Sequence, residues 1–423
     1  MCRRCNFYWS FNHATTILTS TIKTNDVSDG LARRVIIALS IATFGSGMSM
    51  RIMDPMLVQL SLDFAIPLGT ASLTITVFGV AYGFAQLIFG PLGDRYGKVK
   101  IVAWGCYACS LAAFFCGITT EFTGLLIARV LAGITAASII ALSMAWIGDV
   151  VIYEHRQSVL AKFLIGQILG LSTGVFLGGF SIDFFHWRLP FFSFICVWFA
   201  AISAHLGLVI QRLPESTHII QLGEGVGLSR IVGEFRQVLN VTWSKQVLLT
   251  VTLEGAAAFG ALAFIPAHLH TVHNVSLFYS GALVVLFALG GLAFVFRSRF
   301  LVSRFGEVGL IRAGALLMYT ALLFLAWIPF WWWLMPACFL FGLGFYMMHN
   351  TLQINATQMA PERRGAAVAA FALCFFMGQS LGVAINGSLF SVAGTPILLS
   401  CSGLLLIIVG GRFARLRQFR ITR

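Results

Sequence analysis

The sequence predicts an all-α membrane protein with twelve transmembrane helices in two six-helix pseudo-repeats. Hydrophobic residues make up 58% of the 423 residues and charged residues only 10%, whereas charged residues are about a quarter of a soluble domain. A helix needs about 20 apolar residues to cross the hydrocarbon core of a bilayer. Twelve stretches of about this kind lie at 34–60, 70–92, 100–119, 122–147, 159–180, 189–211, 246–269, 277–298, 308–327, 331–355, 365–388 and 395–411.

The two halves of the chain match at an offset of 208 or 209 residues. Three separated motifs share this offset: Arg95-Tyr96-Gly97 with Arg304-Phe305-Gly306, Glu154-His155-Arg156 with Glu362-Arg363-Arg364, and Gly170 and Gly174 with Gly378 and Gly382. One chance match is easy, but three matches in register indicate an internal duplication.

The placement of the basic residues predicts the topology. The net charge of +13 would suggest a nucleic-acid partner for a soluble protein. However, all but three of the 28 Lys and Arg residues fall on one side of the predicted spans, the exceptions being Arg51, Arg129 and Arg188. Basic residues mark the cytoplasmic side of membrane proteins and meet anionic lipids there. We therefore expect both termini in the cytoplasm, no nucleic-acid partner, and a plasma membrane such as the bacterial inner membrane.

A long polar interval after the sixth span divides the chain. The predicted segments are a cytoplasmic tail at 1–33, a six-helix bundle at 34–211, a cytoplasmic linker at 212–245, a second six-helix bundle at 246–411 and a basic cytoplasmic tail at 412–423. Residues 1–33 lack the apolar core and cleavage site of a signal peptide, so the first span is expected to serve as an uncleaved insertion signal.

The cysteines predict packing and no metal site. Cys106 and Cys109 have the C-x-x-C spacing, but they lie in an apolar span with no histidine or second cysteine pair at zinc spacing. The sequence also contains no Walker loop or Ser-His-Asp order. We expect neither an enzyme nor a bound cofactor, and energy for any transport would come from an ion gradient.

The segment from Gly90 to Lys100 reads Gly-Pro-Leu-Gly-Asp-Arg-Tyr-Gly-Lys-Val-Lys and lies between the second and third spans. It resembles the cytoplasmic loop signature of the major facilitator superfamily, whose members are built from two six-helix repeats. The resemblance implies that Asp94 caps the eleventh helix near Gly365 and that Arg95 joins a charge network with Asp149. The implied conformational latch comprises Gly90, Asp94, Arg95, Gly97 and Asp149. A solvated basic turn with no latch role is the alternative.

The fifth span carries a stripe of glycines, which are Gly166, Gly170, Gly174, Gly178 and Gly179. When small residues are spaced four positions apart, they lie on one face of a helix, where two backbones can approach closely. The stripe resembles the family's antiporter motif, although Val175 stands where that motif has proline. The resemblance favours export of the solute, and plain helix packing is the alternative.

Ionisable residues inside membrane spans are costly and indicate function. Arg51 and Asp54 share one face of the first helix, Arg129 lies at a similar depth in the fourth, and Glu254 lies in the seventh. In drug/proton antiporters of this family, a first-helix acid and a fourth-helix arginine are linked to proton coupling, which the resemblance transfers to Asp54 and Arg129. The alternative for Asp54 is a permanent ion pair with Arg51 or Arg129. Glu254 has no obvious basic partner within the spans of its half, which makes it a candidate proton-coupling or cationic-substrate site; a neutral hydrogen-bonded group is the alternative.

Further polar residues within spans are candidates for the substrate cavity. They are Arg51, Gln167, His349, Asn350, Gln353 and Gln379. Each of the uncharged ones can instead form a hydrogen bond between helices.

Together these patterns predict a monomeric secondary transporter that moves a small amphiphilic or sugar-like organic solute through the bilayer by alternating access, by proton-coupled efflux. A proton-coupled importer of a metabolite and a non-transporting membrane sensor or assembly protein are the two alternatives.

Overall fold

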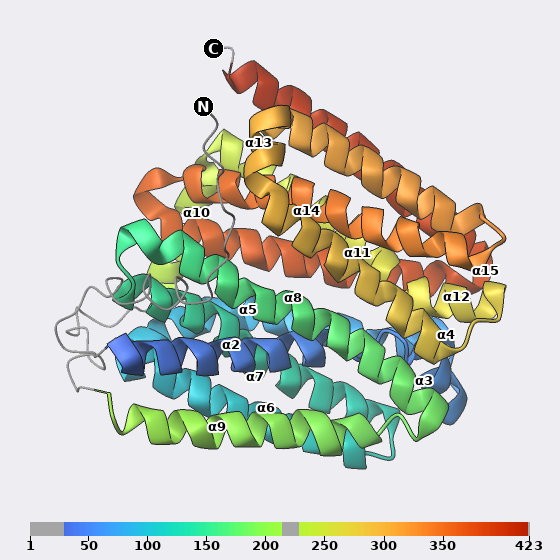
Figure 1. Cartoon of the computed structure of the whole chain (residues 1–423), viewed down its shortest axis with the longest axis horizontal. Helices are drawn as coiled ribbons and strands as arrows, with labels where there is room; N and C mark the ends of the chain where they lie inside the picture. The colour runs from blue at the N-terminus through green and yellow to red at the C-terminus, as the bar shows by residue number, and fades with distance from the viewer. Residues whose placement is uncertain (1–28, 214–227, 422–423) are drawn as a thin grey trace, which may run out of the picture.

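Helices form every regular element in the described residues, 29–213 and 228–421, of the computed structural model (Figure 1). Most of the predicted tail at 1–33 and residues 214–227 of the predicted linker lie outside this range.

Six long helical segments build the N-terminal half. They are α2 (Asp29–Arg51), α5 (Leu73–Tyr96), α6 (Lys98–Ile118), α7 (Phe122–Val150), α8 (Tyr153–Phe184) and α9 (Val197–Ile210), the last preceded by a π-helical turn at Phe191–Cys196. Two short helices, α3 (Leu57–Asp63) and α4 (Leu68–Ala71), join the first segment to the second. The predicted span at 34–60 is thus divided, because Pro55 lacks the N–H that would extend α2 beyond Arg51.

The C-terminal half begins with α10 (Leu228–Asn240), which lies in the predicted linker. The remaining helices are α11 (Thr242–Leu262), α12 (Ile265–His273), α13 (Leu277–Trp327), α14 (Leu334–Gln358) and α15 (Arg364–Ile421). Short 3₁₀ turns at Trp331–Trp333 and Pro361–Arg363 precede α14 and α15. The predicted basic tail is therefore helical as far as Ile421, and Arg417 ties it to the bundle through an ion pair of 2.8 Å with Glu307.

Two glycine breaks account for the number of membrane crossings. Within the described residues, ten helices are long and apolar enough to span a membrane. The two longest, α13 and α15, each contain one non-helical residue, Gly306 with φ 61° and Gly394 with φ 71°. Glycine adopts positive φ without a steric cost, so the chain can change direction at these points. The result is consistent with the twelve predicted spans.

The internal duplication is confirmed by repeated backbone contacts. Gly97 and Gly306, which are matched in sequence, both have positive φ. A side chain added at the fifth-span or eleventh-span glycines would meet a main-chain carbonyl of the facing helix: Gly170 meets Phe44, Gly174 meets Met48, Gly378 meets Thr252 and Gly382 meets Ala256. Both members of each contact are displaced by 208 residues in the second half, so α8 packs on α2 as α15 packs on α11.

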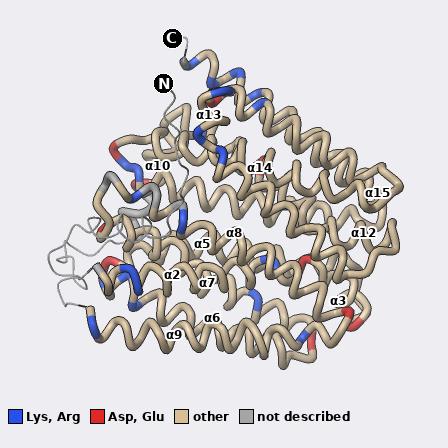
Figure 2. Tube along the Cα trace, viewed as in Figure 1, with Lys and Arg blue, Asp and Glu red and all other residues tan. Residues whose placement is uncertain are grey.

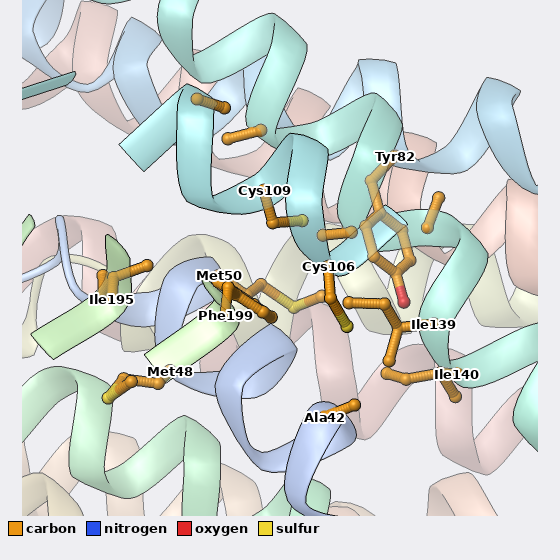
Figure 3. Packing of buried hydrophobic residues seen from close by; sticks show 14 of the residues in the cluster. Ala42, Met48, Met50, Tyr82, Cys106, Cys109, Ile139, Ile140, Ile195 and Phe199 are labelled. Atoms are coloured by element: carbon orange, nitrogen blue, oxygen red, sulfur yellow. The ribbon is translucent and has the colours of Figure 1, made fainter. Parts of the chain in front are cut away.

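Two large hydrophobic clusters form the core, one mainly in each half, and each takes in some residues of the other half. In the N-terminal core, Cys106 and Cys109 lie buried among apolar side chains that include Met50 and Ile139 (Figure 3). Among the described residues, no group of three or more His, Cys, Asp and Glu side chains is placed to hold a metal ion. Both thiols are free and buried in this core.

The two halves meet most closely at one end of the bundle. We call the end that carries Asp94 and Asp149 the inner end and the end that carries Asp63 and Asp183 the outer end. Figure 2 shows Lys and Arg gathered at the inner end.

The outer end is closed. A side chain added at Gly69 would meet the backbone of Gly387, one at Gly179 would meet Leu277, and one at Gly281 would meet Val175. At the inner end, by contrast, an added side chain would meet nothing within 4 Å at Gly90 or Gly365. The protein is therefore closed at the outer end and open around Gly90 and Gly365.

Candidate functional site

The first helix ends in a buried ion pair. Nη2 of Arg51 lies 2.6 Å from Oδ2 of Asp54, and the side chains are only 2% and 0% exposed. These two atoms are close enough for an ion pair, but they are not aligned for a hydrogen bond. Arg51 is the last residue of α2, where a cation also interacts favourably with the helix dipole.

This ion pair lies at the junction of the two halves. The Arg51 guanidinium lies 5.0 Å from the ring centre of Phe259 on α11, a distance typical of a cation–π contact. A charge pair of the N-terminal half therefore rests on an aromatic ring of the C-terminal half.

Arg129 is fully buried and hydrogen-bonds to two backbone carbonyls. Its Nη1 donates to the Ser49 carbonyl at 3.0 Å, and its Nε donates to the Thr74 carbonyl at 3.2 Å. The Ser49 carbonyl is in the last turn of α2, where carbonyls have no partner within the helix. Of the two partners considered for Asp54, Arg51 is the one that lies in direct contact with it.

Glu254 has a partner that the sequence did not reveal. Its Oε2 lies 2.9 Å from Nδ1 of His349, which α14 contributes. The side chains are 0% and 16% exposed, respectively. His349 was expected only as a cavity residue and Glu254 without a basic partner; 95 positions separate them, so the structure alone joins them.

Aromatic rings enclose His349 and connect it to the first pair. The centres of the Phe345 and Phe375 rings lie 4.9 and 4.7 Å from that of His349. The same two rings lie 5.2 and 5.3 Å from the centre of Phe259, which in turn contacts Arg51. Phe259 is thus the link between the two acid–base pairs. It was missed because nothing in the sequence distinguishes it among 39 phenylalanines.

The other predicted cavity residues divide between two locations. Gln379 is 2% exposed on α15, and its backbone lies next to Gly255, one residue from Glu254. Gln167 lies in the N-terminal half, where its carbonyl faces Gly47 of α2. Asn350 and Gln353 are partly buried on α14. Of these candidates, His349 contacts Glu254 directly and Gln379 lies next to it along the facing helix.

The predicted latch residues form a charge network within the N-terminal half. Nζ of Lys98 lies 3.0 Å from Asp94 and 2.7 Å from Asp149. Arg95 instead lies with its guanidinium 5.1 Å from the centre of the neighbouring Tyr96 ring. The expectation for Arg95 is corrected: Lys98, one helical turn beyond Asp94 and across the break at Gly97, takes its place.

The latch does not reach the other half in this conformation. The Asp94 side chain is 57% exposed, and the space around Gly365 at the start of α15 is open. The contact of Asp94 with the eleventh helix therefore remains a prediction for a form closed at the inner end.

Four of the five predicted glycines form a packing surface. A side chain at Gly166, Gly170, Gly174 or Gly178 would meet the carbonyl of Ser40, Phe44, Met48 or Ile52, respectively. These carbonyls repeat every four residues along the first helix and the turn after it, so the alternative of helix packing describes these four. Gly179 alone of the five faces the other half, at Leu277.

Two duplicated six-helix halves with ionisable residues buried at their junction are the architecture of secondary transporters. A family profile described as Major Facilitator Superfamily matches residues 39–383. The chain belongs to this family and is an integral, multi-pass membrane protein.

Three relatives carry transporter names. The chain is 24% identical to the uncharacterized MFS-type transporter YceJ of Bacillus subtilis (strain 168), over 80% of this chain and 85% of that protein. It is 25% identical to multidrug resistance protein 1 of the same strain, over 84% and 88%. It is 30% identical to the multidrug export protein EmrB of Escherichia coli (strain K12), over 53% and 45%.

The fold is also that of solved transporters. A bacterial homologue of the human lysosomal transporter Spinster, in an inward-facing and unoccupied conformation, superposes with a TM-score of 0.74 at 16% identity, over 92% of this chain and 97% of that one. The nucleoside transporter NupG superposes with a TM-score of 0.68 at 16% identity, over 90% and 98%. These similarities confirm the fold.

Proposed function

We propose that the protein is a secondary active transporter that exports a small organic solute in exchange for protons by alternating access. The observation that carries the proposal is the Arg51–Asp54 ion pair, buried where the two halves meet. Ionisable residues are rarely kept within membrane spans unless ions or substrates pass them. The closed outer end and the open inner end correspond to one of the two states that rocking of the halves would produce.

Asp54 is the proposed proton carrier. Taking up one proton neutralises its carboxylate and removes its attraction for Arg51, whose guanidinium also rests on Phe259 of the other half. The charge state of Asp54 therefore affects the contact between Arg51 and Phe259, which joins the two halves. Arg129 supports this site by binding the end of α2 at Ser49; it is proposed as a positioning residue and not as a proton carrier.

Export of an amphiphilic or sugar-like solute is favoured over import by the names of the relatives, which include a multidrug export protein and a multidrug resistance protein. We further propose a plasma membrane such as the bacterial inner membrane, both termini in the cytoplasm, and a monomer with no bound cofactor. Closure of the inner end would bring Asp94 to the start of α15, where a carboxylate is stabilised by the helix dipole.

The test uses inverted membrane vesicles that are acidified inside by respiration and contain a pH-sensitive dye. Adding ethidium, tetraphenylphosphonium or a sugar analogue is expected to release protons from vesicles with the wild-type protein and not from those with Asp54→Asn. The control variant is Glu307→Gln, which removes an acid at the edge of the bundle and should leave proton release unchanged. Equal release by wild type and Asp54→Asn would count against Asp54 as the carrier, and solute uptake driven by the opposite gradient would establish the importer.

A further inference from the structure

The proposed mechanism leaves one buried acid–base pair unused. Oε2 of Glu254 lies against Nδ1 of His349 at 2.9 Å. The second oxygen, Oε1, is buried and has no hydrogen-bond partner in the part of the chain that the structure describes. A carboxylate that is both charged and incompletely hydrogen-bonded in an apolar interior is costly. This arrangement is therefore not the one expected of a purely structural group.

His349 stands between accessible space and the carboxylate. Its side chain is 16% exposed, whereas that of Glu254 is 0% exposed. The rings of Phe345, Phe371 and Phe375 surround the imidazole at 4.9, 5.5 and 4.7 Å. Water therefore meets the imidazole before the acid, and the aromatic rings shield the rest of the pair.

His268, a second buried histidine in the C-terminal half, provides a comparison because its contacts are those of a structural residue. The ring nitrogens of His268 lie 2.6 Å from Oγ1 of Thr395 and 2.8 Å from the Leu325 carbonyl. Both nitrogens are thus occupied by uncharged groups that join α12 to α13 and α15. His349 differs because its buried partner is an acid.

The other titratable or charged groups near the pair are few. On α15, the Cys374 thiol hydrogen-bonds to Thr252, two residues from Glu254. On α14, the Tyr346 ring lies 5.3 Å from that of Phe345. From α2, the Arg51 guanidinium approaches only as far as Phe259. None of these groups replaces His349 as the direct partner of Glu254.

We propose that Glu254 and His349 form a second proton-binding site, so that the transporter carries one proton site in each half. This inference rests on the proposed proton coupling and deepens it. A proton from water binds Nε2 of His349, and the proton on Nδ1 moves to Oε2 of Glu254. Only N–H and O–H bonds change, and the net charge of the pair rises from −1 to 0. The two sites communicate through Phe259, and a full cycle exchanges a proton at each of them.

The test counts protons directly and requires no substrate. The purified full-length protein in detergent is moved from alkaline to mildly acidic pH, above the range where surface carboxylates titrate, and proton uptake is measured with an indicator dye. Relative to wild type, Glu254→Gln should bind about one proton fewer, because a coupled pair titrates as a unit. His349→Gln should shift the pH at which this proton is bound, because the remaining carboxyl group loses its direct partner. Glu307→Gln should match wild type.

The outcomes separate this inference from the proposed function. Uptake equal to wild type in a folded Glu254→Gln protein, or uptake at an unshifted pH in a folded His349→Gln protein, overturns the second site. Loss of uptake only in Asp54→Asn refutes the second site and leaves the transport mechanism standing. A change in proton uptake only in the Glu254 and His349 variants supports the second site and removes Asp54 as a carrier. Gel filtration of each variant establishes that it is folded, and either of the two variants suffices.

Discussion

Replacing Asp183 by alanine is expected to loosen the closure of the outer end. Oδ2 of Asp183, near the end of α8, accepts a hydrogen bond of 2.8 Å from the N–H of Phe278, at the start of α13 in the other half. The first N–H groups of a helix have no partner within it, and a carboxylate there also faces the positive end of the helix dipole. Asp183 therefore caps a helix that belongs to the opposite half.

The size of the effect follows from this geometry. Losing a side-chain cap costs about 0.5–2 kcal/mol, and the exposure of Asp183 places it near the middle of that range. A loss of about 1 kcal/mol raises the population of the outwardly opened form about fivefold. The rings of Phe176, Phe180 and Phe184 remain 5.4, 5.9 and 5.5 Å from that of Phe278, so the closure should weaken without being abolished.

Hydrogen exchange of the purified protein in lipid discs measures this opening. Exchange through brief opening should become about fivefold faster at the outer ends of α8 and α13 in Asp183→Ala. Asp183→Asn should change less, because its amide oxygen can still accept the hydrogen bond. Glu121→Ala is the matched control, since Glu121 precedes α7 and makes no side-chain cap bond. Unchanged exchange at both helix ends in Asp183→Ala would refute the reasoning.

Three further predictions concern packing and the inner network. Gly174→Ala places a methyl group against the Met48 carbonyl and should lower stability by about 1–3 kcal/mol, measured by thermal melting in detergent. Gly148→Ala, whose added methyl meets nothing within 4 Å, should not be destabilised, and equal melting points for the two variants would contradict the packing role. Lys98→Ala leaves Asp94 and Asp149 without their shared cation and should cost only about 0.2–1 kcal/mol per pair. Asp94→Asn should lower transport in reconstituted vesicles while leaving the protein in the membrane, and wild-type rates would exclude a latch role.

The latch illustrates how far a motif predicts contacts. The motif correctly located a charged cluster at the Gly97 turn, where positive φ is observed. It assigned Asp149 to Arg95, but Lys98 occupies that position. Which basic side chain reaches an acid depends on the angle between two helices at a turn, and residue type does not specify that angle.

The glycine stripe illustrates a pattern with two meanings. Spacing of four predicted a close approach of helices, and the contacts of Gly166 and Gly170 with Ser40 and Phe44 confirm it. Whether the facing helix belonged to the same half or to the other half was not encoded in the spacing. The structure assigns four of the glycines to packing within the N-terminal half and only Gly179 to the junction.

The sequence alone determined the class of fold, the duplicated halves and the buried positions that carry charge. These depend on composition and periodicity, because a bilayer requires long apolar helices and makes every ionisable residue within them conspicuous. Only the tertiary structure decided that Asp54 pairs with Arg51, that Glu254 pairs with His349, and that Phe259 joins the two pairs across the halves. Such pairings depend on which helix faces pack together, and in helices that are apolar on every side no local pattern specifies the packed face.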